Sequence, residues 1–337
     1  MTRPIRFAAI GLDHRHIYDM IGGMQAAGGE CVGWWTEGSP ETLNGFERRF
    51  PDLPRVADKR VLLEDAGIDV ILTAAIADQR ASIAIEAMQH GKDVMADKPG
   101  CTTLDDLNAI RQTVAETGRI WSVNFSERFL VPAVGKALQL VRDGAIGRVV
   151  QTIGLGPHRL NSQLRDPWFF ERRQYGGILT DIASHQIDQF LVFTGSTDAE
   201  IVSATARNLA HPQWPELEDF GELLLRSDHG HGYIRVDWFT PDGLPTWGDG
   251  RLLVLGTEGY IELRKYVDIA GRPGTNHLFL VNGSRVEHIP CEGLPLTYFT
   301  DFSADVRNRT ETAMPQRHAF TVMELAIRAQ MRAEGEH

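Results

Sequence analysis

Residues 5–11 read Ile-Arg-Phe-Ala-Ala-Ile-Gly, an apolar β-strand pattern that ends at a glycine. A helical pattern follows through Met20 and Met24, and a second β pattern covers residues 31–35. The alternation continues with strands predicted at 70–75, before Lys98 and at 120–124, and with helices at about 80–90 and 105–117. Strands that alternate with helices favour right-handed crossovers and a parallel sheet. The first third of the chain therefore predicts an α/β domain.

Ligands bind parallel sheets at the carboxyl ends of the strands. The residues expected at that edge are Gly11, Thr36, Ala75, Lys98 and Asn124. Lys98 follows a short apolar strand and precedes a proline, which restricts the backbone of the residue before it. The lysine is therefore expected at a fixed place on the edge, although a lone Lys-Pro pair is more often an exposed loop charge.

Residues 176–185 read Gly-Gly-Ile-Leu-Thr-Asp-Ile-Ala-Ser-His, which places a carboxylate and an imidazole four residues apart on one face of a predicted helix. Asp181 can hydrogen-bond one ring nitrogen of His185, which fixes its tautomer and leaves the other nitrogen for acid–base chemistry. The alternative interpretation is a solvated helix face, with Asp188 one turn further along.

These motifs, in this order, resemble the Gfo/Idh/MocA oxidoreductases, the family of glucose-fructose oxidoreductase and inositol 2-dehydrogenase. Asp97-Lys98-Pro99 stands where the family usually has Glu-Lys-Pro, and Gly176-Gly177 leads to Asp181 and His185. The resemblance continues through residues 218–220, 238–241 and 255–260. It implies an NAD(P)-binding Rossmann domain at 1–125. It also implies an α+β substrate and oligomerisation domain at 126–337, with a large, mostly antiparallel open sheet and a C-terminal helix that packs back on the first domain.

The resemblance also implies NAD(P)-dependent oxidation or reduction of a sugar, cyclitol or related polyol. In the resulting hypothesis a substrate alcohol lies between Lys98 and His185. His185, oriented by Asp181, takes the hydroxyl proton as hydride leaves for the cofactor, and Lys98 stabilises the developing oxyanion. Two alternatives stay open. One is a redox-neutral lyase or glycoside-cleaving enzyme of the same fold that acts through a keto-sugar, and the other is a non-catalytic sugar-binding protein.

The turn at 11–16, Gly-Leu-Asp-His-Arg-His, departs from the usual G-x-G-x-x-G pattern. Asp13 occupies the second glycine position and His16 the third. A carboxylate there repels a phosphate, while Arg15, His14 and His16 could supply compensating positive charge. The cluster could alternatively bind a metal, but it has no matching partner elsewhere in the sequence, so no metal is expected.

Cofactor contacts are expected from the turn and the strand ends. These residues are Gly11, Leu12, Asp13, His14, Thr36, Glu37, Ala74, Ala75, Asp97, Lys98 and Asn124. Ala75-Ile76 replaces the family's Thr-Pro, and Arg80 replaces its usual histidine. Glu37 would favour NAD over NADP, because its carboxylate would repel the 2′-phosphate of NADP. If Thr36 occupies that place instead, the residue does not discriminate between the two cofactors.

Residues 157–175 gather aromatic and cationic side chains ahead of the motif helix. Aromatic faces suit sugar rings, and Arg and His donate to hydroxyls or a carboxylate, so this segment predicts a substrate wall. A surface loop packed by its own aromatics is the alternative. The predicted substrate contacts are Lys98, His158, Arg165, Trp168, Tyr175, Asp181 and His185.

Composition limits the partners. The chain has 337 residues, 42% of them apolar, which is enough for two domains with sizeable cores. The net charge of −11 argues against nucleic acid or an anionic membrane as a partner, and no apolar window is long enough to span a bilayer. The N-terminus lacks a secretory apolar region, so a cytoplasmic location is expected. Three scattered cysteines argue against disulfides and paired-cysteine zinc sites.

Residues 233–239 alternate polar and apolar side chains, which assigns them to opposite faces of a strand. One face carries Tyr233, Arg235, Asp237 and Phe239, and the other carries Ile234, Val236 and Trp238. Helices of the same chain need one face only. The other face is therefore expected to form a homodimer or homotetramer, the alternative being a solvated face on a monomer.

Overall fold

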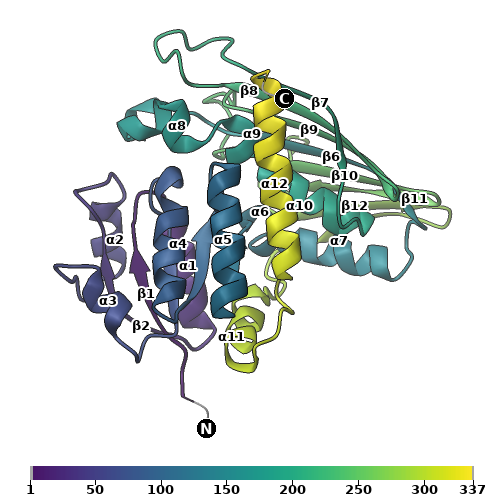
Figure 1. The fold of residues 1–337 in the computed structure, drawn as a ribbon. Coiled ribbons are helices and arrows are strands. Elements are labelled where there is room, and N and C mark those ends of the chain that lie inside the picture. The colour runs from purple at the N-terminus through teal and green to yellow at the C-terminus, as the bar shows by residue number, and fades with distance from the viewer. Residues whose placement is uncertain (1–2, 336–337) are drawn as a thin grey trace. The chain divides into compact units, whose positions relative to one another are not determined.

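The computed structural model describes residues 3–335, which form two compact units (Figure 1). The first unit comprises the described residues up to 124, together with 163–176 and 297–323. The second unit comprises 125–162, 177–296 and the described residues from 324 onward. The first unit is thus built from three separate stretches of sequence, so two later segments join the α/β part of the chain.

The first unit contains a five-stranded parallel sheet in the order β2-β1-β3-β4-β5. Its strands are β1 (Arg6–Ile10), β2 (Glu30–Trp35), β3 (Val70–Thr73), β4 (Asp93–Asp97) and β5 (Trp121–Asn124). Its helices are α1 (His16–Ala26), α2 (Leu43–Arg49), α3 (Arg60–Glu64), α4 (Arg80–Gln89), α5 (Leu104–Thr117), α8 (Arg172–Tyr175) and α11 (Tyr298–Asn308). Every residue of β3, β4 and β5 is buried, as expected of strands covered on both faces.

Helices cover the two faces of this sheet. Helix α1 packs on β2, β3 and α11, whereas α4 packs on β3, β4 and α5. The ends of α5 follow from its sequence: the Thr103 side chain accepts a hydrogen bond from the Asp106 N–H at 3.1 Å, and Gly118 ends the helix in the left-handed conformation. The strand order changes direction between β1 and β3, which is the point where such sheets bind ligands.

The second unit contains an eight-stranded sheet in the order β13-β12-β11-β10-β6-β9-β8-β7. Its strands are β6 (Val149–Pro157), β7 (Glu200–Arg207), β8 (Phe220–Ser227), β9 (Gly230–Asp237), β10 (Arg251–Gly256), β11 (Gly259–Arg264), β12 (His277–Asn282) and β13 (Val286–Pro290). Its helices are α6 (Ser126–Phe129), α7 (Pro132–Arg142), α9 (Ile178–Asp181) and α10 (Ala183–Thr194). The β6–β9 pair is parallel, and the other neighbours are antiparallel.

One face of this sheet packs on helices: α10 covers β6 and β9, and α7 covers β11 and β12. Ile234, Val236 and Trp238 are buried, as the alternation at 233–239 predicts. On the other face Leu224 pairs with Tyr233, and Leu255 pairs with Tyr260. On this face Leu224 is 42% exposed, and Leu255 and Tyr260 are each 38% exposed. This face therefore presents apolar side chains outward.

The predicted fold class is confirmed, with differences at the level of single elements. The predicted strands and long helices are present within one or two residues at most ends, whereas α2, α3, α11 and β13 were not expected. Helix α12 (Gln316–Ala333) crosses the division between the units, since residues up to Met323 belong to the first and those from Glu324 to the second. Among residues 3–335 no helix is long and apolar enough to cross a membrane.

Candidate active site

The turn after β1 is tied to the ends of the neighbouring strands. Gly11 has a φ of +82°, and a Cβ at this position would lie 2.4 Å from Cβ of Ala75. The Leu12 N–H donates to the Thr36 hydroxyl at 3.2 Å, and the His14 N–H donates to the Ala74 carbonyl at 2.9 Å. The strand ends predicted to contact a cofactor therefore do come together, and Gly11 is required by this close approach.

Asp13 lies within this turn, at the second glycine position of the usual pattern. Burial raises the pKa of its carboxyl to about 6, against the opposing effect of the Arg80 guanidinium. Above that pH the turn carries a negative charge where a dinucleotide's pyrophosphate would approach the backbone. Asp13 is therefore the one residue of the turn that opposes a phosphate.

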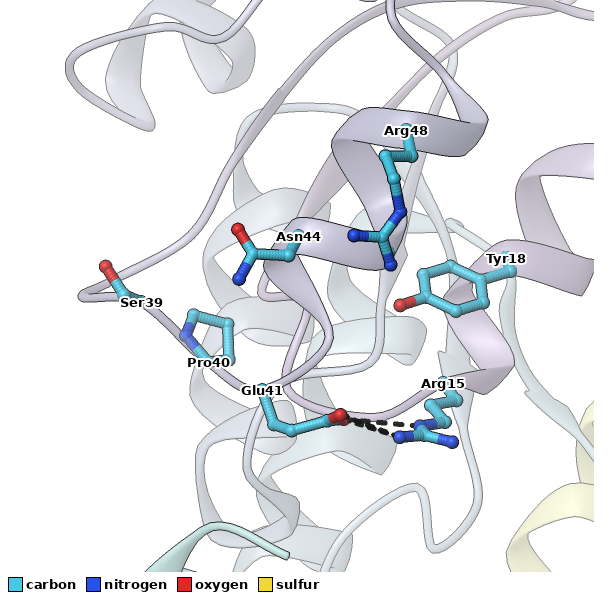
Figure 2. Close-up of a pocket in the computed structure, with 8 residues that line it drawn as sticks. Arg15, Tyr18, Ser39, Pro40, Glu41, Asn44 and Arg48 are labelled. Atoms are coloured by element: carbon cyan, nitrogen blue, oxygen red, sulfur yellow. Dashed lines mark hydrogen bonds and ion pairs between the residues drawn. The ribbon is translucent and has the colours of Figure 1, made fainter. Parts of the chain in front are cut away.

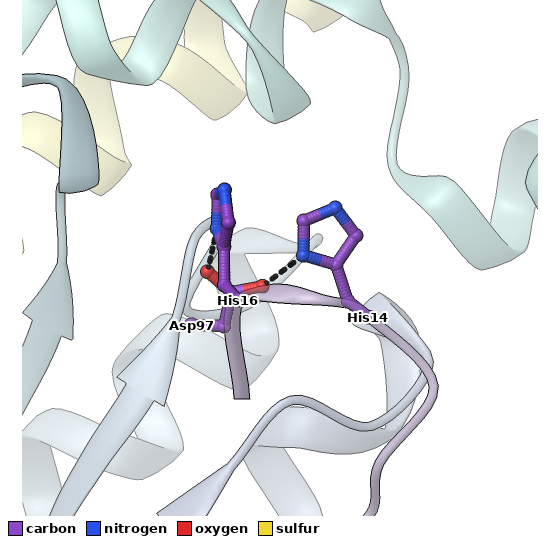
Figure 3. Close-up of side chains that lie close together, drawn as sticks. All are labelled: His14, His16 and Asp97. Atoms are coloured by element: carbon purple, nitrogen blue, oxygen red, sulfur yellow. Dashed lines mark hydrogen bonds and ion pairs between the residues drawn. The ribbon is translucent and has the colours of Figure 1, made fainter. Parts of the chain in front are cut away.

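Asp97, the last residue of β4, lies against two histidines of the turn and accepts a hydrogen bond from one of them, His16 (Figure 3). Nδ1 of His14 lies 2.7 Å from Oδ2, and Nδ1 of His16 lies 2.7 Å from Oδ1. Burial alone would raise the pKa of Asp97, but His16, His14 and Arg80 hold it well below its usual value. Burial lowers the pKa of His14, so that ring is neutral. These three residues could hold a metal ion. His16 and Asp97 are 81 positions apart, so no local sequence pattern indicates the cluster.

Lys98 follows Asp97 and is buried, so it is not an exposed loop charge. Its backbone N–H donates to Oδ1 of Asp97 at 2.8 Å, and its peptide bond to Pro99 is cis. Arg80 is buried and donates to the carbonyls of Ala75, Lys98 and Pro99. Arg80, predicted at the cofactor edge, therefore ties the backbone of Lys98 and Pro99 to the segment that follows β3.

A cavity of about 560 Å³ opens beyond the end of β2 (Figure 2). Its lining residues are Arg15, Tyr18, Ser39, Pro40, Glu41, Asn44, Gly45 and Arg48. Figure 2 shows Arg15 and Glu41 directed at one another, and their ion pair measures 2.7 Å. Thr36 is buried, and its hydroxyl accepts a hydrogen bond from the Leu12 N–H. Glu37, the next residue after the strand, is exposed. Of the two candidates for an acidic ribose contact, Glu37 is therefore the accessible one.

Asn124 ends β5 at the same edge of the sheet and is buried. Among the described residues, neither its amide nitrogen nor its amide oxygen has a hydrogen-bond partner. Buried amides are usually satisfied, so an unsatisfied one at a ligand-binding edge indicates an absent partner. The first unit thus offers the open strand ends, the cavity after β2 and an unsatisfied amide, which fit a dinucleotide, with Asp13 as the opposing group.

The aromatic segment divides between the two units. Arg165 and Trp168 belong to the first unit and line a small hollow with Asp13, His14 and Arg15. This places two of the predicted substrate residues against the altered turn. The segment predicted to form the substrate wall is therefore divided between the two units.

Two further residues of that segment have different surroundings. Tyr175 is buried, with its ring stacked on Phe169 at 6.2 Å between centroids, so it packs the segment. His158 belongs to the second unit, where its Nδ1 lies 3.0 Å from the Gly156 carbonyl oxygen. Its ring packs against two indoles, with centroid distances of 5.2 Å to Trp238 and 4.6 Å to Trp247.

Asp181 and His185 lie on two consecutive helices rather than one. Helix α9 ends at Asp181, and α10 begins at Ala183 after Ile182. Asp181 has an exposed fraction of 8%, and His185 of 1%. The interpretation of a solvated helix face is therefore wrong, because α10 covers the sheet. The His185 ring packs edge-on against Phe125, with centroids 6.4 Å apart.

Distant residues fix the start of α9. Gly177 has a φ of +85°, and a Cβ there would lie 2.2 Å from Cδ of Gln330. The Leu179 N–H donates to Gln330 Oε1 at 3.0 Å, and the Ile178 N–H donates to Glu218 at 2.9 Å. These two side chains satisfy backbone donors that a helix start leaves open. They hold the helix that delivers Asp181.

A buried polar network lies next to His185 along α10. Lys265 Nζ donates to Glu127 Oε2 at 2.6 Å and to Gln189 at 3.1 Å, and Gln186 donates to the same Glu127 oxygen at 3.0 Å. Burial would raise the pKa of Glu127, but Lys265 and His185 hold it at about 2. Sequence reasoning missed this pair, because its members are 138 positions apart.

Arg128 and Asp188 form a second ion pair of the unit, at 2.7 Å. Asp188 is fully buried, so it is a structural partner of Arg128 and no part of a solvated face. The Arg128–Asp188 pair joins α6 to α10 directly, and Glu127 of α6 is linked to α10 through Gln186. They fix the helix that carries His185.

Two family models match the chain. The model for the oxidoreductase family with an NAD-binding Rossmann fold covers residues 5–125, and the GFO/IDH/MocA C-terminal domain model covers residues 134–262. The chain belongs to the Gfo/Idh/MocA family. This member is an NAD(P)-dependent oxidoreductase, as the resemblance implied, and its first unit contains the dinucleotide-binding fold.

Two of the relatives with a named substrate are dehydrogenases. The scyllo-inositol 2-dehydrogenase (NAD(+)) of Bacillus subtilis (strain 168) is 28% identical over 270 residues, 77% of this chain and 74% of that protein. The levoglucosan dehydrogenase of Pseudarthrobacter phenanthrenivorans is 31% identical over 166 residues, 48% of this chain and 42% of that protein.

Solved structures share the whole fold. A crystal structure from Erwinia carotovora atroseptica SCRI1043, named only as an oxidoreductase, is 49% identical, covers 98% of both chains and has a TM-score of 0.95. A levoglucosan dehydrogenase in complex with NADH and levoglucosan is 19% identical, covers 99% of this chain and 98% of that chain, and has a TM-score of 0.81. At this identity, the similarity to the levoglucosan dehydrogenase is a similarity of fold alone.

Proposed function

We propose that this protein transfers hydride between NAD(P) and a ring polyol: a sugar, an anhydrosugar or a cyclitol. The observation that carries the proposal is that both acid–base motifs are buried and fixed, Lys98 at the end of β4 and His185 on α10. Relatives whose names specify scyllo-inositol and levoglucosan support the substrate class. Neither a lone surface lysine nor a solvated helix would need such anchoring.

The roles follow from the chemistry of these side chains. His185 accepts the hydroxyl proton of the substrate, and Asp181 orients its imidazole. Lys98 donates to the substrate oxygen and stabilises the charge that develops there. When bound, the nicotinamide would supply the acceptor for the hydride of the carbinol carbon, which would leave a ketone, reduced nicotinamide and the proton held by His185.

In this proposal the first unit holds the dinucleotide. The residues that would hold it are Gly11, Leu12, His14, Thr36, Glu37, Ala74, Ala75, Asp97, Lys98 and Asn124, with Asp13 opposing. His158, Arg165 and Trp168 are proposed to contact the substrate, because indole and guanidinium groups suit ring C–H surfaces and hydroxyls. Tyr175 supports them through packing on Phe169.

The proposal is tested by the absorbance of reduced nicotinamide. Tag-free protein is incubated with NAD⁺ or NADP⁺ and a panel of inositols, anhydrosugars and aldoses, and its absorbance is also recorded before any addition. Reduction that depends on one polyol class supports the dehydrogenase. Conversion of substrate with no net change in a cofactor that purifies with the protein would instead support the redox-neutral alternative. Polyol binding without conversion, with either dinucleotide bound, would support the sugar-binding alternative.

Replacement of Asp13 by glycine should tighten dinucleotide binding by roughly tenfold, about 1.4 kcal/mol, because it removes a negative charge beside the pyrophosphate. Asp13→Asn should give a similar gain, since it removes the charge and keeps the size. Calorimetric titration of NAD⁺ into wild type and both variants measures the change. Weaker binding to both variants would show that the carboxylate assists the cofactor.

Glu37 should make the protein prefer NAD to NADP. Removing its charge by Glu37→Ala should therefore raise the affinity for NADP⁺ severalfold relative to NAD⁺, since the 2′-phosphate no longer meets a carboxylate. Calorimetry with both dinucleotides provides the measurement, and Glu47→Ala, at another exposed acid of the same unit, is the control. Tighter NADP⁺ than NAD⁺ binding to wild type would contradict the prediction.

We infer that the outer face of the second unit's sheet joins copies of this chain as a dimer or tetramer. Leu224, Leu255, Tyr260 and Phe239 expose apolar surface there or at its end, which suits a two-fold interface. Sedimentation equilibrium at micromolar protein should give a multiple of the 37.6 kDa chain mass. Phe239→Glu should disrupt the assembly, while Val61→Glu, an exposed apolar position of the first unit, should not. A single species at the chain mass would refute the interface.

A further inference from the structure

The cluster of His14, His16 and Asp97 offers three ligand groups at one place (Figure 3). One ligand atom from each residue lies within 4.8 Å of the others. We propose that these three residues bind a divalent transition-metal ion. Two imidazoles and one carboxylate are the ligand set of many Zn²⁺ and Fe²⁺ sites, and Co²⁺ and Mn²⁺ accept the same donors.

The contacts within the cluster are close to those of a metal site. Bonds of about 2.1 Å hold neighbouring ligand atoms roughly 3 Å apart. Each Nδ1 already lies 2.7 Å from a different oxygen of Asp97, so shifts of a few tenths of an ångström would bring these atoms to the spacing of ligands around one ion. The three residues then supply up to four ligand atoms, and the remaining positions are open to water, a hydroxyl or a phosphate oxygen.

The surroundings give the ion a route to the carboxylate. Asp97 has no exposed surface, whereas the His14 ring is 20% exposed and the His16 ring 26%. Figure 3 shows the rings directed at separate oxygens of Asp97, which leaves their far edges away from it. An ion can therefore enter past the rings, as a usable metal site requires.

Two cationic side chains near the cluster oppose metal binding and therefore lower the affinity of the site for the ion. Arg80 Nη2 lies 3.4 Å from Asp97 Oδ2, but Arg80 makes closer contacts with the carbonyls of Ala75, at 2.8 Å, and Pro99, at 3.1 Å. Lys98 influences His14 electrostatically. These charges favour an anionic ligand at the open positions of the ion. The proposal is independent of the dehydrogenase activity, since binding is measured without dinucleotide or substrate.

The test uses full-length protein without a polyhistidine tag, treated with a chelator and dialysed. Titration with Co²⁺, followed by its visible absorption, and dialysis against Zn²⁺, followed by elemental analysis, should each give one ion per chain. His14→Ala and His16→Ala should each weaken binding by at least about 10- to 100-fold. The control removes two exposed hairpin histidines, His229→Ala and His231→Ala, and should leave binding unchanged.

A measurement on wild type alone keeps the proposal testable if the variants fold poorly. X-ray absorption of the Zn²⁺ protein should show a nitrogen and oxygen shell at about 2.0–2.1 Å with scattering from two imidazoles. Less than one ion per chain, a shell without imidazole scattering, or loss of binding in the hairpin variant but not in the turn variants would overturn the proposal.

Discussion

Replacing His185 or Lys98 by alanine should lower kcat on the best ring polyol by about 10²- to 10⁴-fold, the usual contribution of general acid–base catalysis. His185→Ala removes the proton acceptor, and Lys98→Ala removes the group that stabilises the oxyanion. Dinucleotide affinity should change far less for His185→Ala, because His185 lies in the second unit and the dinucleotide-binding fold in the first.

The measurement is steady-state reduction of NAD(P)⁺ at saturating cofactor, with calorimetric cofactor binding as the check on folding. His90→Ala, at an exposed position after α4, is the matched control and should keep wild-type kcat. Asp181→Asn should lower kcat less than His185→Ala does, since it disturbs the orientation of the base and leaves the base in place. Near wild-type turnover in either alanine variant would remove that residue from the mechanism.

Replacing Glu127 by glutamine should lower the free energy of unfolding by about 3–5 kcal/mol, the range observed when one partner of a buried ion pair is removed. Lys265 is then left as a buried ammonium group without its carboxylate. Removing both charges, in Glu127→Gln with Lys265→Met, should recover much of the loss. Glu200→Gln, in the exposed pair with Arg226, should cost less than about 1 kcal/mol.

The effect of Glu127 should depend on pH in a defined direction. Its pKa is lowered from 4.5 to about 2 in the folded protein, so its stabilising contribution is present above pH 4.5 and is lost as the pH falls through 2. The difference in unfolding free energy between wild type and Glu127→Gln, measured by denaturant unfolding at several pH values, should therefore be full at pH 7 and should narrow below 4.5. A constant difference down to pH 2 would contradict this account.

The sequence predicted what local patterns encode. The alternation of strand and helix patterns, with glycine at a turn, predicted the parallel sheet. The order of two short motifs predicted Lys98 and His185 as acid–base groups. The segment that forms β13, Val286–Pro290, is five residues long and places two polar residues side by side, so it carries too little pattern for prediction. Helix α11 is amphipathic, but no strong start or stop signal in the sequence marks its ends.

The sequence did not predict contacts between distant residues. His16 meets Asp97 across 81 positions, and Lys265 meets Glu127 across 138, so neither pair leaves a local signature. The aromatic segment shows the same limit. Arg165 and Trp168 adjoin the altered turn of the first unit, while His158 adjoins two tryptophans of the second, although the three are close in sequence.

Transfer of deuterium tests the central claim most directly. A ring polyol that supports turnover is prepared with deuterium on the carbinol carbon and incubated with wild-type protein and NAD(P)⁺, and both products are analysed by mass spectrometry. Direct hydride transfer predicts one deuterium on the reduced nicotinamide for each ketone formed. Substrate conversion with deuterium released to water and no labelled reduced nicotinamide would contradict the assignment of this protein as a polyol dehydrogenase.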